Sequence, residues 1–182
     1  MGDQKDVDFF GWQETIDRGA KRLIITEGED DAVAGTKILE LYTKDDFKDN
    51  MPALVSLPHG SAAAAADLTR LMPKIKEYGF KDISFCFDMD KAGEKATEEC
   101  CKVCPQATVI ALPKKDLNDC LVEGVGKAAW KAMTFNAVKK KNTRLVFANQ
   151  DLHLDAREPA RFGELTYPWN DVNEITRGIR YG

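Results

Sequence analysis

A buried strand that ends in two closely spaced carboxylates limits what this chain can fold into more than any other feature. The apolar run 83–87 stops at Asp88 and Asp90, and residues 91–104 follow with apolar side chains at helical spacing. This stretch is therefore a strand, loop and helix unit. Residues i and i+2 of an extended segment point to the same side, so the two carboxylates can converge on one point. Two anions held that close repel each other unless a hard cation lies between them, and Mg²⁺ is the usual cation of oxygen-only sites.

The same alternation of strand and helix runs along most of the chain. Apolar runs predict three more strands, at 22–26, 53–57 and 108–112. Helical patterns cover residues 31–42, 61–78 and 91–104, and one or two short helices extend to residue 136. This order indicates βαβ units, and hence an α/β fold with a roughly four-stranded, mainly parallel sheet flanked by helices.

Finer features of the helices also follow from the pattern. We expect Ser61 to be a helix N-cap, Leu41 to face the core and Pro73 to kink or interrupt its helix. Three aromatic side chains in four positions are rarely all left in water, so we expect them to pack on the edge of the domain: Phe9, Phe10 and Trp12.

Polar side chains that can perform chemistry follow each predicted strand. Because right-handed crossovers put all four strand ends at one edge of the sheet, we expect these residues to gather there: Glu27, His59, Gly60, Asp88, Asp90 and Asp116. Each acid also has a plainer interpretation, as a helix cap or a solvated loop residue. Asp31 fits either an indirect metal contact or a first-turn acid on a helix dipole. His59 fits a loop residue that bonds the backbone, or a catalytic group.

The chemistry of nucleotidyl transfer suggests a role for each of these groups. Asp88 and Asp90 are suitable metal ligands, and Glu27 could complete the site or take a proton from a 3′-hydroxyl. Asp116 could hold a second ion. The helix that follows could be capped by Asn118 or Asp119 nearby instead of by Asp116. Three glycines would let the backbone approach phosphate closely: Gly28, Gly60 and Gly93. Four lysines would hold triphosphate or template: Lys91, Lys95, Lys114 and Lys115.

Composition and charge indicate a soluble globular protein. The chain has 182 residues, of which 43% are hydrophobic and 31% charged, typical of a folded domain with a sizeable core. No apolar run approaches the roughly 20 residues of a membrane helix, and residues 1–8 lack a signal-peptide pattern. The chain has five cysteines, an odd number, which argues against a set of disulfides. A reducing cytoplasm is therefore expected. A net charge of −4 restricts any nucleic-acid contact to local basic patches.

Three segments are expected along the chain. Residues 1–20 form a leader, residues 21–137 form the α/β domain, and residues 138–182 form a linker that leads into a truncated further domain. The run Lys139–Lys141 opens this last segment and is either a solvated face or a nucleic-acid contact. Cys101 and Cys104 have C-x-x-C spacing without a second pair, so a zinc site is not expected.

Two of these motifs resemble the TOPRIM domain shared by primases, topoisomerases and certain nucleases. They are the segments 27–31 (EGEDD) and 88–93 (DMDKAG). With VSLPHG and LPKKDLNDCL in the same order, the pattern is similar to the primase half of the bifunctional primase–helicases of tailed bacteriophages and their mitochondrial helicase relatives. The resemblance covers residues 20–136 and implies a Rossmann-like TOPRIM fold. It also implies that residues 1–20 end an upstream RNA-polymerase subdomain and that the tail begins a helicase.

The resemblance further implies a DNA primase that makes RNA primers from NTPs on single-stranded DNA during DNA replication, with Mg²⁺ or Mn²⁺ as cofactor. Glu27, Asp88 and Asp90 would then be the catalytic residues and, with Asp116, the metal ligands. The implied partners are the template, NTPs and a helicase on the same chain, in the host cytoplasm or a replication compartment. Without a zinc-ribbon pattern or a Walker lysine motif, we expect the chain alone to be weakly active or inactive.

Other classes stay open at this point. A TOPRIM nuclease or topoisomerase would use the same acids to break a phosphodiester, and a topoisomerase would need a tyrosine from another domain. A non-catalytic module of a replication machine would keep the acids without the chemistry. A haloacid-type phosphatase is disfavoured, because Ala92 stands where that class needs threonine or a similar residue.

Overall fold

Five strands form one mixed sheet in this computed structural model, which describes residues 7–139. The sheet order is β2-β1-β3-β4-β5. The strands are β1 (Arg22–Thr26), β2 (Ala53–Ser56), β3 (Asp82–Cys86), β4 (Thr108–Val109) and β5 (Val138–Lys139). The first four are parallel, and β5 runs antiparallel to β4. The prediction of an α/β fold with a mainly parallel sheet is thus confirmed.

Two strands differ from the prediction. β4 contains only two residues of the expected run 108–112, because the ladder to β3 ends with the bond from the Ile110 amide to the Phe85 carbonyl. Val138 and Lys139, which we expected in the linker, form β5. Both side chains are exposed, so no alternation of apolar and polar residues marks this strand in the sequence. The rest of the expected linker, residues 140–182, lies outside the described residues.

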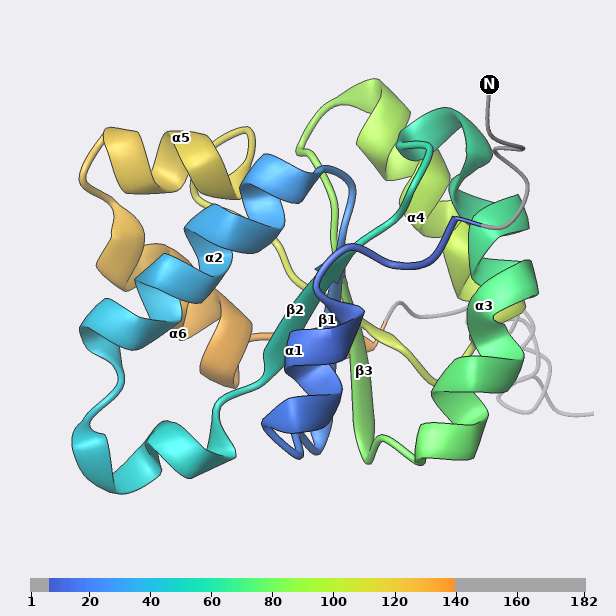
Figure 1. Cartoon of the computed structure of the whole chain (residues 1–182). Helices are drawn as coiled ribbons and strands as arrows, with labels where there is room; N and C mark the ends of the chain where they lie inside the picture. Colours follow the sequence, from blue (N-terminus) through green and yellow to red (C-terminus); the bar gives the residue numbers. More distant parts are fainter. Residues whose placement is uncertain (1–6, 140–182) are drawn as a thin grey trace, which may run out of the picture. The chain divides into compact units, whose positions relative to one another are not determined.

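Helices cover both faces of the sheet (Figure 1). On one face lie α2 (Glu29–Tyr42), α5 (Leu117–Val122) and α6 (Gly126–Phe135), and on the other α3 (Ala64–Tyr78) and α4 (Lys91–Val103). A short α1 (Trp12–Asp17) packs by β2 at the edge of the sheet, and two 3₁₀ turns complete the fold, at Asp45–Asn50 and Ser61–Ala63. Among residues 7–139, no helix is both long and apolar enough to span a bilayer.

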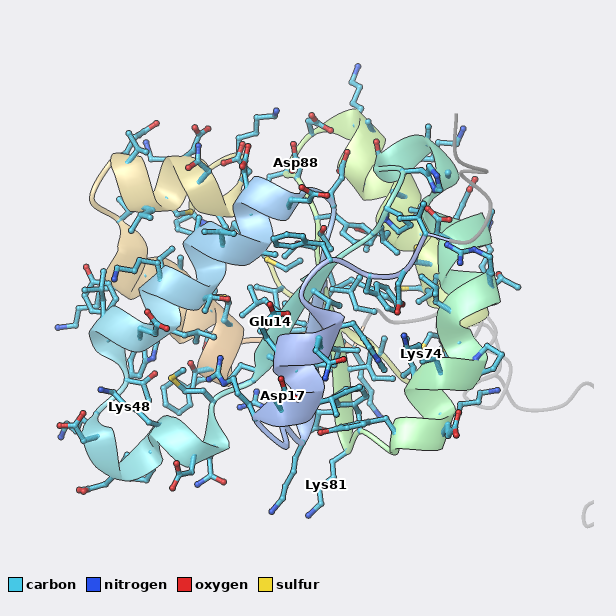
Figure 2. The ribbon with its side chains drawn as sticks, in the orientation of Figure 1. Glu14, Asp17, Lys48, Lys74, Lys81 and Asp88 are labelled. Atoms are coloured by element: carbon cyan, nitrogen blue, oxygen red, sulfur yellow. The ribbon has the colours of Figure 1, made fainter. Side chains whose placement is uncertain are left out.

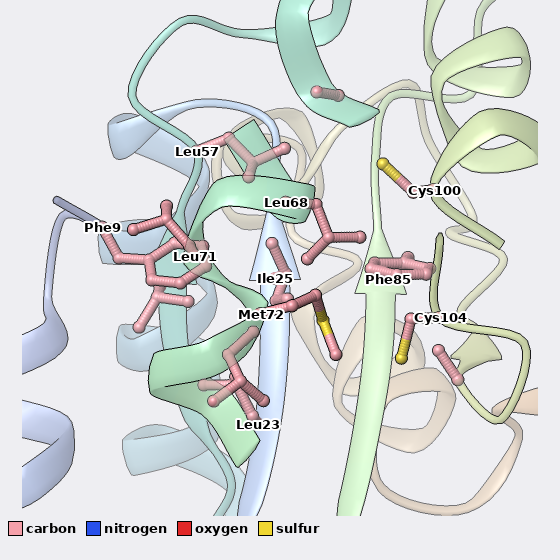
Figure 3. Packing of buried hydrophobic residues seen from close by; sticks show 14 of the residues in the cluster. Phe9, Leu23, Ile25, Leu57, Leu68, Leu71, Met72, Phe85, Cys100 and Cys104 are labelled. Atoms are coloured by element: carbon pink, nitrogen blue, oxygen red, sulfur yellow. The ribbon is translucent and has the colours of Figure 1, made fainter. Parts of the chain in front are cut away.

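Alternate residues of the strands feed two separate cores. Ile25 and Phe85 point to the α3 and α4 side, where they pack with Leu68 and Cys100 (Figure 3). Their neighbours Ile24 and Cys86 point to the opposite side, where the core is made by buried residues of α2, α5 and α6: Ile38, Leu39, Leu117, Cys120, Ala129 and Met133. This period of two explains why a parallel strand buried on both faces reads as a continuous apolar run.

Three of the finer expectations are wrong, and for Pro73 an interruption of the helix is excluded. Ser61 belongs to a 3₁₀ turn and does not cap α3, which starts after Ala63. Leu41 is 58% exposed rather than buried, because it lies past the inward stripe of α2. Pro73 lies within α3 without ending it, and the helix stops at Gly79, where φ is 80°. Phe10 is 42% exposed, and its backbone forms a two-way bridge to Ser56 on the outer side of β2.

The other two aromatic residues near the start pack as expected. Phe9 and Trp12 are buried and stack with their ring centroids 5.6 Å apart. Trp12 also meets Tyr78 and Phe80 edge-on. The segment before β1 is therefore attached to the α3 side of the sheet rather than lying free of it.

Gly93 lets α4 begin directly against the loop that follows β3. A Cβ built at this position collides with the carbonyl oxygen of Asp88 and lies 2.9 Å from its carbonyl carbon. Both atoms belong to the backbone, so a side-chain rotation cannot relieve the overlap. The loop that carries the two carboxylates can keep this conformation only with glycine at position 93.

We predict that Gly93→Ala lowers the free energy of unfolding by about 2 kcal/mol, since overlap with fixed atoms costs more than the roughly 1 kcal/mol that alanine gains in a helix. Urea denaturation followed by circular dichroism measures this change. The control is Lys95→Ala on the exposed face of the same helix, which we expect to change stability by no more than about 0.5 kcal/mol. Equal stability of the two variants would contradict the packing argument.

Candidate functional site

The sheet brings Glu27 and the Asp88–Asp90 loop to the same edge. Thr26 of β1 pairs with Cys86 of β3 in parallel register, so Glu27 and Asp88 both lie just beyond the ends of neighbouring strands, which are about 4.8 Å apart. Figure 2 shows Asp88 at one end of the molecule and Lys81, which precedes β3, at the other. This is the carboxyl edge, where ligands bind in open α/β sheets.

Asp90 is the N-cap of α4. Its Oδ1 accepts hydrogen bonds from the amides of Ala92 at 2.9 Å and Gly93 at 3.0 Å. These bonds, the one from Gly93 above all, lower the pKa of Asp90. Because Oδ1 is used by the helix, Oδ2 is the oxygen that remains for a cation.

Asp88 lies deeper than Asp90, with 17% of its side chain exposed. Burial raises the pKa of Asp88, and the neighbouring charges of Glu27 and Asp116 raise it further, while Lys115 opposes this shift. The ammonium of Lys115 lies 3.1 Å from Oδ2 of Asp88 and 3.8 Å from Oδ2 of Asp90. One cation thus serves both carboxylates.

Glu27 has one oxygen engaged and one without a partner. Its Oε1 accepts a hydrogen bond of 3.2 Å from the backbone amide of Ser61. Its Oε2 is buried and has no hydrogen-bond partner among the described residues. A buried, unpaired carboxylate oxygen is costly, so such an atom usually serves a proton, a ligand or an ion.

Asp31 and Asp116 both serve the start of α5. Asp116 is its N-cap, with Oδ1 accepting the Asp119 amide at 2.6 Å. Asp31 reaches across from α2, and its Oδ1 accepts the amides of Leu117 at 3.1 Å and Asn118 at 3.3 Å. Burial, with smaller contributions from the charges of Asp116 and Asp88, raises the pKa of Asp31 to about 6. An open hollow of about 430 Å³ lies between these two acids.

His59 is held by a residue that the sequence did not single out. Its Nδ1 lies 3.0 Å and 3.1 Å from the two carboxylate oxygens of Asp67, which is buried in α3. Arg70 donates to the same carboxylate at 3.3 Å. Asp67 follows a run of alanines and shares the inward stripe with Leu68 and Leu71, but its pairing with His59 depends on how α3 packs, which the sequence does not show. His59 thus bonds a side chain rather than the backbone.

The remaining candidates fall into separate groups. Lys114 pairs with Glu123, the C-cap of α5, and not with the acids of the loop, whereas Lys91 and Lys95 are exposed on α4. Gly28 is the N-cap of α2, and Gly60 has a positive φ of 67°. Of the lysines expected to bind a nucleotide, Lys115 is therefore the one that the structure brings to the carboxylates.

The donor set suits a hard divalent cation that shares its shell with a substrate. Within residues 7–139, no three histidine, cysteine or acidic side chains form a ready-made metal cluster. Mg²⁺ is commonly held by one or two carboxylates together with water and substrate phosphates. Asp88 and Asp90 supply two such oxygens, already paired with a positive charge, and Glu27 adds an oxygen without a partner. The residues present therefore fit such an ion.

The fold and this acidic edge define an α/β domain that places a glutamate and a D-x-D pair at the ends of neighbouring parallel strands. The sequence model of the Toprim-like family matches residues 24–121, more than half of the chain, and the chain belongs to this family.

Similar proteins are found among the replication proteins of bacteriophages. The chain is 38% identical over 112 residues to the DNA helicase/primase of Enterobacteria phage T3. The aligned stretch covers 60% of this chain and 18% of that protein. The chain thus spans less than a fifth of that relative.

Two solved structures from bacteriophage T7 resemble this one. The first is an assembly of the lagging-strand DNA polymerase with primase domains bound to an RNA/DNA hybrid and dTTP, with a TM-score of 0.55, 31% identity and coverage of 68% of this chain and 58% of that chain. The second is the primase fragment of the primase–helicase protein, with a TM-score of 0.53, 29% identity and coverage of 65% and 45%.

We predict that Asp31→Asn stabilises the metal-free protein above about pH 6 but not below about pH 4. The pKa of Asp31 rises from its ordinary 3.8 to about 6 on folding, so the folded state is penalised only where that carboxyl must ionise. Asparagine keeps an oxygen for the α5 amides. Because the group is only partly buried, we expect about 1 kcal/mol, or a few degrees in Tm.

Thermal melting of both proteins in EDTA from pH 4 to pH 8 measures this difference. A gain in Tm that does not change with pH would contradict the assignment of the raised pKa to Asp31.

Proposed function

We propose that this chain is the catalytic part of a DNA primase of the phage primase–helicase type. It would use Mg²⁺ to join ribonucleotides into RNA primers on single-stranded DNA. The named relatives support this proposal, since they are a helicase/primase and primase domains bound to an RNA/DNA hybrid and dTTP. The helicase partner on the same polypeptide belongs to the proposal as well.

One observation carries the proposal. The parallel pairing of β1 with β3 puts Glu27 within electrostatic reach of Asp88, where its charge raises the pKa of that carboxyl. Folding would not gather like charges at a solvent-facing edge for stability alone, because each raises the cost of ionising the others. Such a cluster is what a cation-dependent reaction of phosphates requires.

Each side chain has a role in this proposal. Bound Mg²⁺ would neutralise the triphosphate and stabilise the leaving pyrophosphate. Asp88 and Asp90 would hold it through their Oδ2 atoms, and Asp116 would assist a second ion from the neighbouring loop. Glu27 Oε2, which is buried and unpaired, would complete the coordination or accept the proton of the attacking 3′-hydroxyl. Lys115 would neutralise a phosphate oxygen.

Cleavage of DNA by a topoisomerase route would need a tyrosine from outside the described residues. The two tyrosines within residues 7–139 are Tyr42 and Tyr78, at the C-terminal ends of α2 and α3. Tyr78 packs on Trp12 and Phe80, and Tyr42 lies by Gly126 of α6. Neither adjoins the acidic edge.

We predict that Asp88→Asn lowers the affinity for Mg²⁺ by at least about tenfold, because it removes one of two charged ligands. Isothermal titration calorimetry of the chain with MgCl₂ measures this change. Asp82→Asn is the matched control: it makes the same change at the opposite end of β3, where exposed Asp82 lies beside Arg22, and should shift the affinity by less than twofold. If both variants bind Mg²⁺ alike, the metal site is not at Asp88.

The reaction itself is tested with the natural full-length protein. It is supplied with NTPs, Mg²⁺ and single-stranded DNA templates, or with supercoiled DNA and Mg²⁺ or Mn²⁺. We expect template-dependent oligoribonucleotides that disappear with Asp88→Asn. Nicking of supercoiled DNA without synthesis would assign the chain to the cleaving members of the family instead. If the protein carries out neither reaction, the chain is a non-catalytic module.

A further inference from the structure

We infer that the ammonium group of Lys115 occupies the cation position of the Asp88–Asp90 pair in the metal-free protein, and that a divalent cation must displace it, which frees it for the phosphates of the incoming nucleotide. This inference rests on the proposed function, because it describes how the same site changes between its metal-free and its loaded state.

The first step of the argument is the identity of the oxygens involved. Asp90 Oδ1 is engaged by two amides of α4, so its Oδ2 is the oxygen left for a cation. The ammonium of Lys115 lies 3.8 Å from that atom and 3.1 Å from Asp88 Oδ2. Of the oxygens available to a metal ion, the two Oδ2 atoms of the Asp88–Asp90 pair are therefore the ones that Lys115 already neutralises.

The second step is the way in which Lys115 is held. The amide of Met89, between the two acids, donates a hydrogen bond of 2.7 Å to the carbonyl of Lys115. This bond fixes the start of the lysine side chain beside the D-x-D loop. The side chain of Lys115 is 54% exposed, whereas that of Asp88 is 17% exposed, so the lysine pairs with the deeper carboxylate from a more exposed position.

The third step is electrostatic. Asp88 lies near Glu27 and Asp116, whose charges raise its pKa, and the ammonium of Lys115 beside Asp88 reduces the repulsion within this group of acids without a metal. A divalent cation bound to the same oxygens repels the ammonium at short range. Once displaced, the half-exposed lysine remains tethered at the metal and is positioned to bind phosphate as a point charge.

This arrangement makes opposite predictions for two ligands. Lys115→Gln should raise the affinity for Mg²⁺ by at least about fivefold, because no ammonium has to be displaced. In saturating Mg²⁺, the same variant should lower the affinity for an NTP by at least about fivefold, because the released charge is missing. Calorimetry with MgCl₂, and then with ATP in saturating MgCl₂, measures both without relying on catalysis.

Two further variants separate displacement from a general change of charge. Lys114→Gln removes the same charge one residue away, where the ammonium pairs with Glu123, and should raise the Mg²⁺ affinity by no more than about twofold. Lys115→Arg keeps the charge and should not raise it at all. Lys81→Gln, at the opposite end of the sheet, is the control for ATP binding. Thermal melting of each variant checks that it is folded.

Each outcome has a defined meaning. Tighter Mg²⁺ binding by Lys115→Gln with weaker ATP binding supports the exchange. Unchanged or weaker Mg²⁺ binding by Lys115→Gln, or an equal gain in Lys114→Gln, overturns it, while the proposed metal site stands as long as Asp88→Asn still loses Mg²⁺. If the unmodified protein and Asp88→Asn bind Mg²⁺ equally, both the exchange at Lys115 and the proposed function are overturned.

Discussion

Repulsion among carboxylates at one edge of the sheet is the constraint to which the local structure responds. Glu27, Asp31, Asp88, Asp90 and Asp116 all lie there, and each is balanced by backbone amides, by the ammonium of Lys115 or by both. Glu27 takes a backbone amide from the 3₁₀ turn after β2, Asp90 takes two amides of α4, and Asp31 takes two amides of α5. Helix N-termini carry a partial positive charge, so α4 and α5 both begin where the negative charge is greatest. Lys115 supplies the one full positive charge that contacts the D-x-D pair among the described residues. The edge is therefore stable enough to fold and still short of positive charge, which is the condition under which a cation binds.

Much of this organisation follows from the sequence. The apolar runs that end at Thr26, Leu57 and Phe87 are strands because they are too short for helices and are followed by turn residues. Once they are strands joined by helices, the right-handed crossover rule determines which ends meet. The gathering of Glu27 with the Asp88–Asp90 loop was thus predictable from spacing and topology, and the parallel register of β1 with β3 agrees with it.

The parts that could not be predicted depend on contacts between segments distant in sequence. β5 has two exposed residues and no apolar alternation, so only its pairing with β4 identifies it. Asp67 becomes important because α3 turns it towards His59, and a helix face is specified by packing rather than by residue type. Lys115 and Lys114 look equivalent in sequence, yet one pairs with Asp88 and the other with Glu123. Gly93 looked like a residue for phosphate approach, and the structure adds a need to admit the backbone of Asp88.

The bridge from Phe10 to Ser56 has a consequence for how this domain behaves at high concentration. Outer strands with free amides and carbonyls invite pairing between molecules. Here the backbone of Phe10 takes up the groups of Ser56 on the outer side of β2, and at the other border β5 is only two residues long and carries the charge of Lys139. Both borders of the sheet, over the part of the chain that the structure describes, thus offer little length for another copy to extend. Intermolecular strand addition, a common start of aggregation in α/β domains, is disfavoured by features that take no part in the chemistry.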